Sequence, residues 1–106
     1  MTDFARKITD AARELADATV AEMALEDSRI TAKVAAIDRI MAAGDNTFTG
    51  KPHSFSSAEA IVNTDESYQT YLERQRNAVR DRILARGAYD AAVAAARLAE
   101  KGTVGV

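Results

Sequence analysis

Residues 3–43, DFARKITDAARELADATVAEMALEDSRITAKVAAIDRIMAA, decide the fold of this chain. The stretch contains no proline or glycine, and its apolar residues recur at the spacing of one side of an α-helix. That side is formed by Phe4, Ile8, Ala12, Leu15, Val20, Met23, Ile30, Val34, Ile37 and Met41. The pattern predicts one helix over about residues 3–43, roughly 60 Å long at ~1.5 Å per residue. A helix of that length has no core of its own, so it must pack against a partner.

A second long helix is predicted over about residues 57–101. Ser56, followed by Glu59 three residues later, matches the capping box that starts many helices. Thr64, followed by Asp65 and Glu66, is a second start signal with acids in the first turn. The sequence leaves open whether residues 57–63 are continuous with the long helix. Residues 102–106 are expected to form a flexible tail.

The predicted loop over residues 44–56 contains most of the unusual residues of the chain. Gly44 is expected to end the first helix in the left-handed conformation. The only proline, the only histidine (His53) and two of the three phenylalanines, Phe48 and Phe55, follow it. The two aromatic rings either cap the open end of the hairpin, which is the preferred interpretation, or form a knob that binds a partner.

These elements predict an all-α fold, an antiparallel hairpin of two long helices in one domain over residues 1–101. The apolar side of the first helix is wider than one neighbouring helix can cover, and Leu25 projects outside it. We therefore expect a homo-oligomer, a dimer or higher, built as a four-helix bundle. Its interface residues are predicted to be Val20, Met23, Ile30, Val34, Ile37 and Met41.

The second helix changes its apolar side midway. Its first part presents Tyr68 and Val79, whereas Leu84, Ala91 and Leu98 lie on a different side. Gly87 stands at the change, which predicts a kink or the close approach of another backbone. The many alanines beyond it suit tight packing between helices, because small side chains let the helix axes come close.

Composition excludes several classes of protein. The 106 residues carry a formal charge of −2 and no cysteine, so disulfides and thiolate metal ligands are ruled out. No segment approaches the ~18 consecutive apolar residues of a membrane span, and we expect a cytoplasmic protein that does not contact a membrane. The single histidine stands apart from any metal-ligating or catalytic spacing, so no catalytic residue, metal or cofactor is expected.

A band of arginines is the strongest functional signal. It comprises Arg74, Arg76, Arg80, Arg82 and Arg86, with Glu73 and Asp81 as the only acids over that stretch. Arginines at this spacing can contact phosphates, and Tyr68 or Tyr71 could stack on bases. The competing interpretation, which the sequence favours, is a solvated helix surface with weak ion pairs.

Part of the second half resembles a group of uncharacterised helical proteins. The segments Ser57-Ala-Glu-Ala, Asp65-Glu-Ser-Tyr68, Tyr71-Leu and Arg76-Asn-Ala-Val, followed by an alanine-rich helix, are similar to small proteins encoded by bacteriophages and prophages. The resemblance implies an accessory protein in the cytoplasm of a bacterial host during phage growth. It implies no defined activity.

The residues and the resemblance together predict a non-enzymatic helical module that oligomerises and binds an unknown protein partner. The first alternative is a nucleic-acid-associated accessory protein that uses the arginine band, and the second is a structural or assembly component of a virion. The aromatic residues Phe48 and Phe55 are candidates for contact with either kind of partner.

Overall fold

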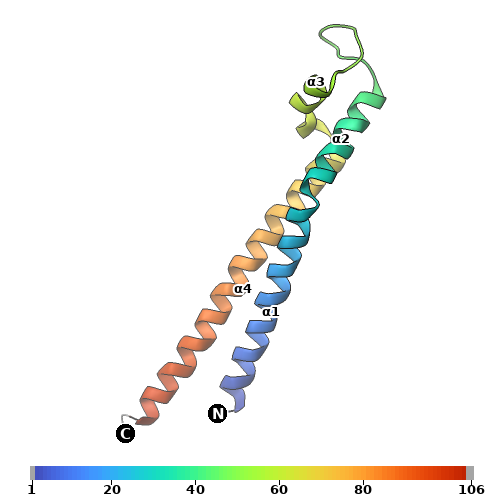
Figure 1. The fold of residues 1–106 in the computed structure, drawn as a ribbon. Coiled ribbons are helices and arrows are strands. Elements are labelled where there is room, and N and C mark those ends of the chain that lie inside the picture. Colours follow the sequence, from blue (N-terminus) through green and yellow to red (C-terminus); the bar gives the residue numbers. More distant parts are fainter. Residues whose placement is uncertain (1, 105–106) are drawn as a thin grey trace. The chain divides into compact units, whose positions relative to one another are not determined.

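A computed structural model describes residues 2–104, of which 86% are helical, and no strand occurs among them. The elements are α1 (Thr2–Asp27), α2 (Arg29–Ala43), α3 (Phe55–Ala60), the 3₁₀ helix η1 (Val62–Thr64) and α4 (Glu66–Val104). The long helices α1 and α4 pack together, as Figure 1 shows. The predicted all-α helical hairpin is confirmed.

The first predicted helix is interrupted at one residue. Ser28 (φ −89°, ψ 1°) separates α1 from α2, where the sequence predicts one continuous helix. Its hydroxyl donates a hydrogen bond to the carbonyl of Leu25 (3.0 Å). A serine that bonds back to the preceding turn commonly bends a helix, because it competes with the regular backbone hydrogen bonds.

The later helices begin at residues other than those predicted. Ser54, two residues before the expected Ser56, caps α3 by accepting a hydrogen bond from the amide of Ser57 (3.2 Å). Asp65, in place of Thr64, caps α4 by accepting one from the amide of Tyr68 (2.9 Å). The Thr64 hydroxyl instead donates to the carbonyl of Ile61 (2.7 Å) within the 3₁₀ turn. Residues 57–63 are therefore separate from the long helix.

The end of the chain and its mid-helix glycine also differ from expectation. α4 continues to Val104, so the predicted tail is helical over residues 102–104, and residues 105–106 lie outside the described part. α4 passes through Gly87 without interruption. A Cβ atom at Gly87 would meet no atom within 4 Å, so no other described part of the chain approaches it closely.

The chain divides into two compact units. Unit 1 combines Met1–Met23 with Asn77–Val106, and unit 2 is Ala24–Arg76.

Unit 1 consists of parts of α1 and α4 that run antiparallel. On each helix, half-buried residues recur at alternating steps of four and three. They are Phe4, Ile8, Ala11, Leu15, Ala18 and Glu22 on α1, and Arg82, Ala85, Tyr89, Ala92, Ala96 and Ala99 on α4. The packed side thus follows a period of about 3.5 residues, whereas the predicted side drifts away from it through Ala12, Val20 and Met23, all exposed.

Unit 2 contains nearly all of the buried core. α2, α3 and η1 contact one another and supply the buried residues Ala36, Ile37, Ala58 and Val62. The buried Tyr68 of α4 completes this core. Leu25, which was expected to project away from the packed side, is half-buried, and its carbonyl accepts a hydrogen bond from the Tyr71 hydroxyl.

The loop between α2 and α3 is held by its own hydrogen bonds. The Asn46 amide donates to the Lys51 carbonyl (2.8 Å), and the Gly50 amide donates to the Asn46 carbonyl (2.8 Å). Gly50 has φ 66°, the left-handed conformation that favours glycine. Gly44, for which that conformation was predicted, is extended (φ 161°, ψ −173°).

Candidate functional site

Unit 2 exposes apolar residues along α2. Ile30 is 77% exposed, and Val34 and Met41 are also exposed. These three residues belong to the predicted oligomer interface. Ile37, the fourth α2 residue of that prediction, is fully buried and belongs to the core, because α3 and η1 fold over its side of the helix.

Unit 1 presents apolar residues on both of its helices. Val20 (65% exposed) and Met23, the remaining residues of the predicted interface, lie on α1. Ile83, Leu84 and Leu98 are exposed on α4, and Leu98 is 70% exposed. The sequence placed Leu84 and Leu98 on the second apolar side of this helix, and within the described chain both are mostly exposed.

A shallow groove runs along one side of unit 1. It is lined by Glu14, Ala18, Asp81, Leu84, Ala85 and Ala88. Its floor is apolar, while Glu14 and Asp81 place two exposed carboxylates at its edge. The sequence pattern did not single out this groove, because only the pairing of α1 with α4 brings Glu14 next to Asp81.

The arginine band divides into paired and unpaired members along α4. Arg82 donates to the Glu22 carboxylate, and Arg86 forms an ion pair with Asp90 (3.5 Å). Arg74, Arg76 and Arg80 are exposed and form no ion pair within residues 2–104.

The two tyrosines that could stack on bases in the nucleic-acid interpretation both make contacts within unit 2. Tyr68 is buried in the core of unit 2, and its ring stacks on that of Tyr71 with the centroids 6.1 Å apart. The Tyr71 hydroxyl donates a hydrogen bond to the carbonyl of Leu25.

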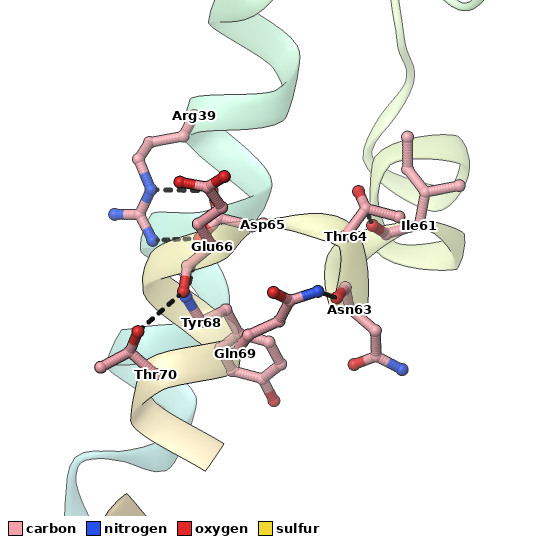
Figure 2. A network of polar contacts seen from close by, with 9 residues as sticks. All are labelled: Arg39, Ile61, Asn63, Thr64, Asp65, Glu66, Tyr68, Gln69 and Thr70. Carbon is pink, nitrogen blue, oxygen red and sulfur yellow. Dashed lines mark hydrogen bonds and ion pairs between the residues drawn. The ribbon is translucent and has the colours of Figure 1, made fainter. Parts of the chain in front are cut away.

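The start of α4 carries a network of polar contacts, shown in Figure 2. Arg39 donates two hydrogen bonds to the Asp65 carboxylate, from Nε (3.1 Å) and from Nη2 (2.8 Å). The guanidinium lowers the pKa of Asp65 by hydrogen bonding, against a smaller opposing effect of burial, and the amide of Tyr68 lowers it further. The same contact raises the pKa of Arg39. This network joins α2 to α4 and serves the fold.

The loop aromatics do not cap the hairpin. Phe48 is 95% exposed, and its amide donates to the Asn46 side-chain oxygen (2.9 Å), so a hydrogen-bonded turn holds the ring out in solvent. Phe55, the first residue of α3, is also more exposed than buried. His53 is half-buried, with its Nδ1 atom 2.9 Å from the Ser57 hydroxyl.

No cluster of three or more potential metal ligands gathers within residues 2–104. None of the helices described has the length and apolar character needed to cross a membrane. Comparison with protein-family models, with curated proteins and with solved structures gives no match.

Proposed function

We propose that this protein is a non-enzymatic helical module that self-associates and binds protein partners through its exposed apolar faces. The observation that supports the proposal is the contrast between two isoleucines of α2. Ile37 is completely buried in the core, whereas Ile30, seven residues earlier on the same helix, lies in solvent. A large exposed apolar surface costs free energy in water, at roughly 25 cal/mol per Å². Surfaces of this kind typically mark sites of protein association.

The proposal is tested by sedimentation velocity on the full chain at micromolar concentration. We expect at least a dimer. Ile30→Asp should shift the protein to monomer, because it places a charge in a desolvated interface. The helical circular-dichroism spectrum should persist, since the Ile30 side chain is 77% exposed and is not part of the core.

Thr31→Asp is the matched control, because it adds the same carboxylate at the adjacent exposed position. It lies about 100° further around α2 and should leave association unchanged. An unmodified protein that sediments as a monomer at every concentration would contradict the proposal.

The alternative function, nucleic-acid association, draws on the three unpaired arginines of α4. Changing Arg76 and Arg80 to glutamine should then flatten the salt dependence of binding by about two units on a log–log plot. We favour the protein-binding function, which predicts no measurable DNA or RNA affinity near about 0.15 M salt. Fluorescence anisotropy with a labelled oligonucleotide distinguishes the two.

A further inference from the structure

We infer that a cavity between the α2–α3 loop and α3 binds a small neutral aromatic ligand that carries one N–H or O–H donor, of the indole class. The cavity lies within unit 2, and this binding role goes beyond the proposed self-association. Two observations carry the inference. An aromatic ring stands uncovered at the cavity, and a histidine nitrogen beside it is left as a free hydrogen-bond acceptor.

The cavity is small, and solvent reaches it from only part of its surface. Its volume is about 310 Å³, at the lower end of the range for small-molecule sites. Apolar side chains, from Phe48 and Ile61, line one part of it, and polar side chains, from Asn46, His53 and Ser57, line another. No aspartate, glutamate, lysine or arginine is among the lining residues. Because a desolvated charge without a partner is costly, this lining favours a neutral ligand.

Phe48 offers the ligand the face of its ring. It lines the cavity but is 95% exposed, so no other part of the described chain covers the ring. The Phe48 amide donates to the Asn46 side-chain oxygen (2.9 Å), and the Asn46 amide donates to the Lys51 carbonyl (2.8 Å). The loop is thus held in shape before a ligand arrives, which lowers the entropic cost of binding. Aromatic rings pair by offset stacking or edge to face, so an aromatic ligand uses this ring best.

His53 supplies the polar contact. The Ser57 hydroxyl has a single proton and lies 3.1 Å from the Ser54 carbonyl oxygen, which can only accept, and 2.9 Å from Nδ1 of His53. Both contacts are hydrogen bonds only when Ser57 donates to Ser54 and the Nδ1–H group of His53 donates to Ser57. In a neutral imidazole, a proton on Nδ1 makes Nε2 the acceptor. No hydrogen bond to Nε2 is formed within residues 2–104, so this nitrogen is free to accept from a ligand.

These features together select the class of ligand. A ring without an N–H or O–H group would leave the His53 acceptor desolvated and unpaired, which should lower affinity about fivefold or more. A charged ligand would lose its hydration against an uncharged lining. Indole meets both conditions, because it is a compact neutral ring system with one N–H donor.

A fluorescence titration with indole tests the inference directly. The chain contains no tryptophan, so indole is the only emitter when excitation lies beyond the tyrosine absorption band. At mildly alkaline pH, where imidazole is neutral, we expect the unmodified protein to bind indole with a Kd of about 0.1–1 mM. 1-Methylindole, which lacks the N–H donor, should bind about fivefold or more weakly. Absence of indole binding, or equal affinity for the two compounds, would overturn the inference.

Variants of His53 and Ser57 test the hydrogen bond separately from the shape of the cavity. His53→Phe keeps a ring but removes the acceptor, so it should bind indole and 1-methylindole with affinities within about twofold of each other. Ser57→Ala removes the group that holds the proton on Nδ1, and should weaken indole more than 1-methylindole. A preference for indole that persists in His53→Phe would show that another group accepts the N–H.

The two exposed phenylalanines of this region give a matched pair for the stacking contact. Phe48→Ala should weaken both compounds about two- to tenfold while leaving the preference for indole intact. Phe55→Ala removes an equal ring that does not line the cavity and should change neither affinity. Equal losses in the two variants would contradict a contact with Phe48.

The outcomes are independent of the proposed self-association. Ile30→Asp, which should be monomeric, should bind indole with the same Kd as the unmodified protein, because Ile30 does not line the cavity. Loss of indole binding in that variant would place the ligand on the self-association surface and overturn the cavity assignment. Heteronuclear NMR with indole should shift amide signals within residues 46–61, and shifts centred elsewhere would overturn it as well.

Discussion

Unit 2 closes a small core around Ile37, whereas unit 1 has a single buried residue among those described, Ala78. The difference follows from the number of elements that meet. In unit 2, α3 and η1 lie against α2 and so add a further layer. In unit 1 two helices alone touch along one side, and a single side covers only part of each helix surface. Unit 2 thus buries more of its apolar surface internally, while unit 1 leaves Val20, Met23, Ile83, Leu84 and Leu98 exposed.

The two units also differ in the polar side-chain contacts that join their elements. Unit 2 joins its elements with the bidentate Arg39–Asp65 pair, the bond from Gln75 Nε2 to Glu26 (2.6 Å) and the ion pair of Lys33 with Glu59 (3.2 Å). Unit 1 joins its two helices through Arg82 and Glu22.

The largest expected effect breaks the core of unit 2. Ile37→Ala should lower the free energy of unfolding by about 2–5 kcal/mol, because it leaves a cavity at a fully buried position. Ile30→Ala, the same change seven residues earlier on α2, should cost less than about 0.5 kcal/mol at a dilution where the chain is monomeric. Urea denaturation followed by circular dichroism measures both. Equal effects would contradict the assigned burial of the two isoleucines.

A smaller effect is expected at the start of α4. Asp65→Ala should cost about 1 kcal/mol through loss of the helix cap, and it also removes the partner of Arg39. Asp65→Asn keeps a capping oxygen and removes only the charge, so it should cost less. Thr64→Ala, at the cap position that the sequence predicts, should cost less than Asp65→Ala. If Thr64→Ala lowered the free energy of unfolding more than Asp65→Ala in urea denaturation, Thr64 would be the helix cap.

The Asp65 carboxylate also makes stability depend on pH. Because Arg39 lowers its pKa in the folded state, the unfolded chain binds the proton more tightly. The stabilisation is therefore present above the ordinary carboxyl pKa of 3.8 and is lost as the pH falls below it. Asp65→Asn should flatten this part of the stability profile, and an unchanged acid limb would argue against the Arg39 contact.

The smallest expected effect strengthens unit 1. Gly87→Ala should raise the free energy of unfolding of the monomer by about 0.5–1 kcal/mol, because alanine restricts the unfolded chain and its Cβ meets no neighbour. A thermal melt at high dilution measures the change. A loss of stability would show that the glycine is needed within the chain itself.

Several features of the fold could be predicted from periodicity. Both long helical segments and the loop between them follow from apolar spacing and from the placement of glycine and proline. The side of α1 that packs was predicted only in part, since Phe4, Ile8 and Leu15 fit spacings of both 3.6 and 3.5 residues. A period of 3.6 residues predicts that Val20 packs and Leu25 does not, whereas a period of 3.5 residues predicts the reverse. The contact with α4 follows the shorter period, so Val20 is exposed and Leu25 is half-buried.

The helix starts show why local signals were insufficient. Ser54, Ser56, Asp65 and Thr64 all have side chains that can cap a helix. Asp65 was selected because Arg39, 26 residues away, holds its carboxylate in place. A sequence pattern does not report that contact.

The sequence by itself determined that the chain is helical, that two long segments must pair, and that their apolar surface exceeds what one pairing covers. These properties depend on local propensity and spacing, which neighbouring residues set. Only the tertiary structure decided that Ile37 is core while Ile30 is surface, that Phe48 stands in solvent, and that Glu14 and Asp81 edge one groove. Those outcomes depend on where other elements pack along and around each helix, and contacts between residues distant in the chain set that choice.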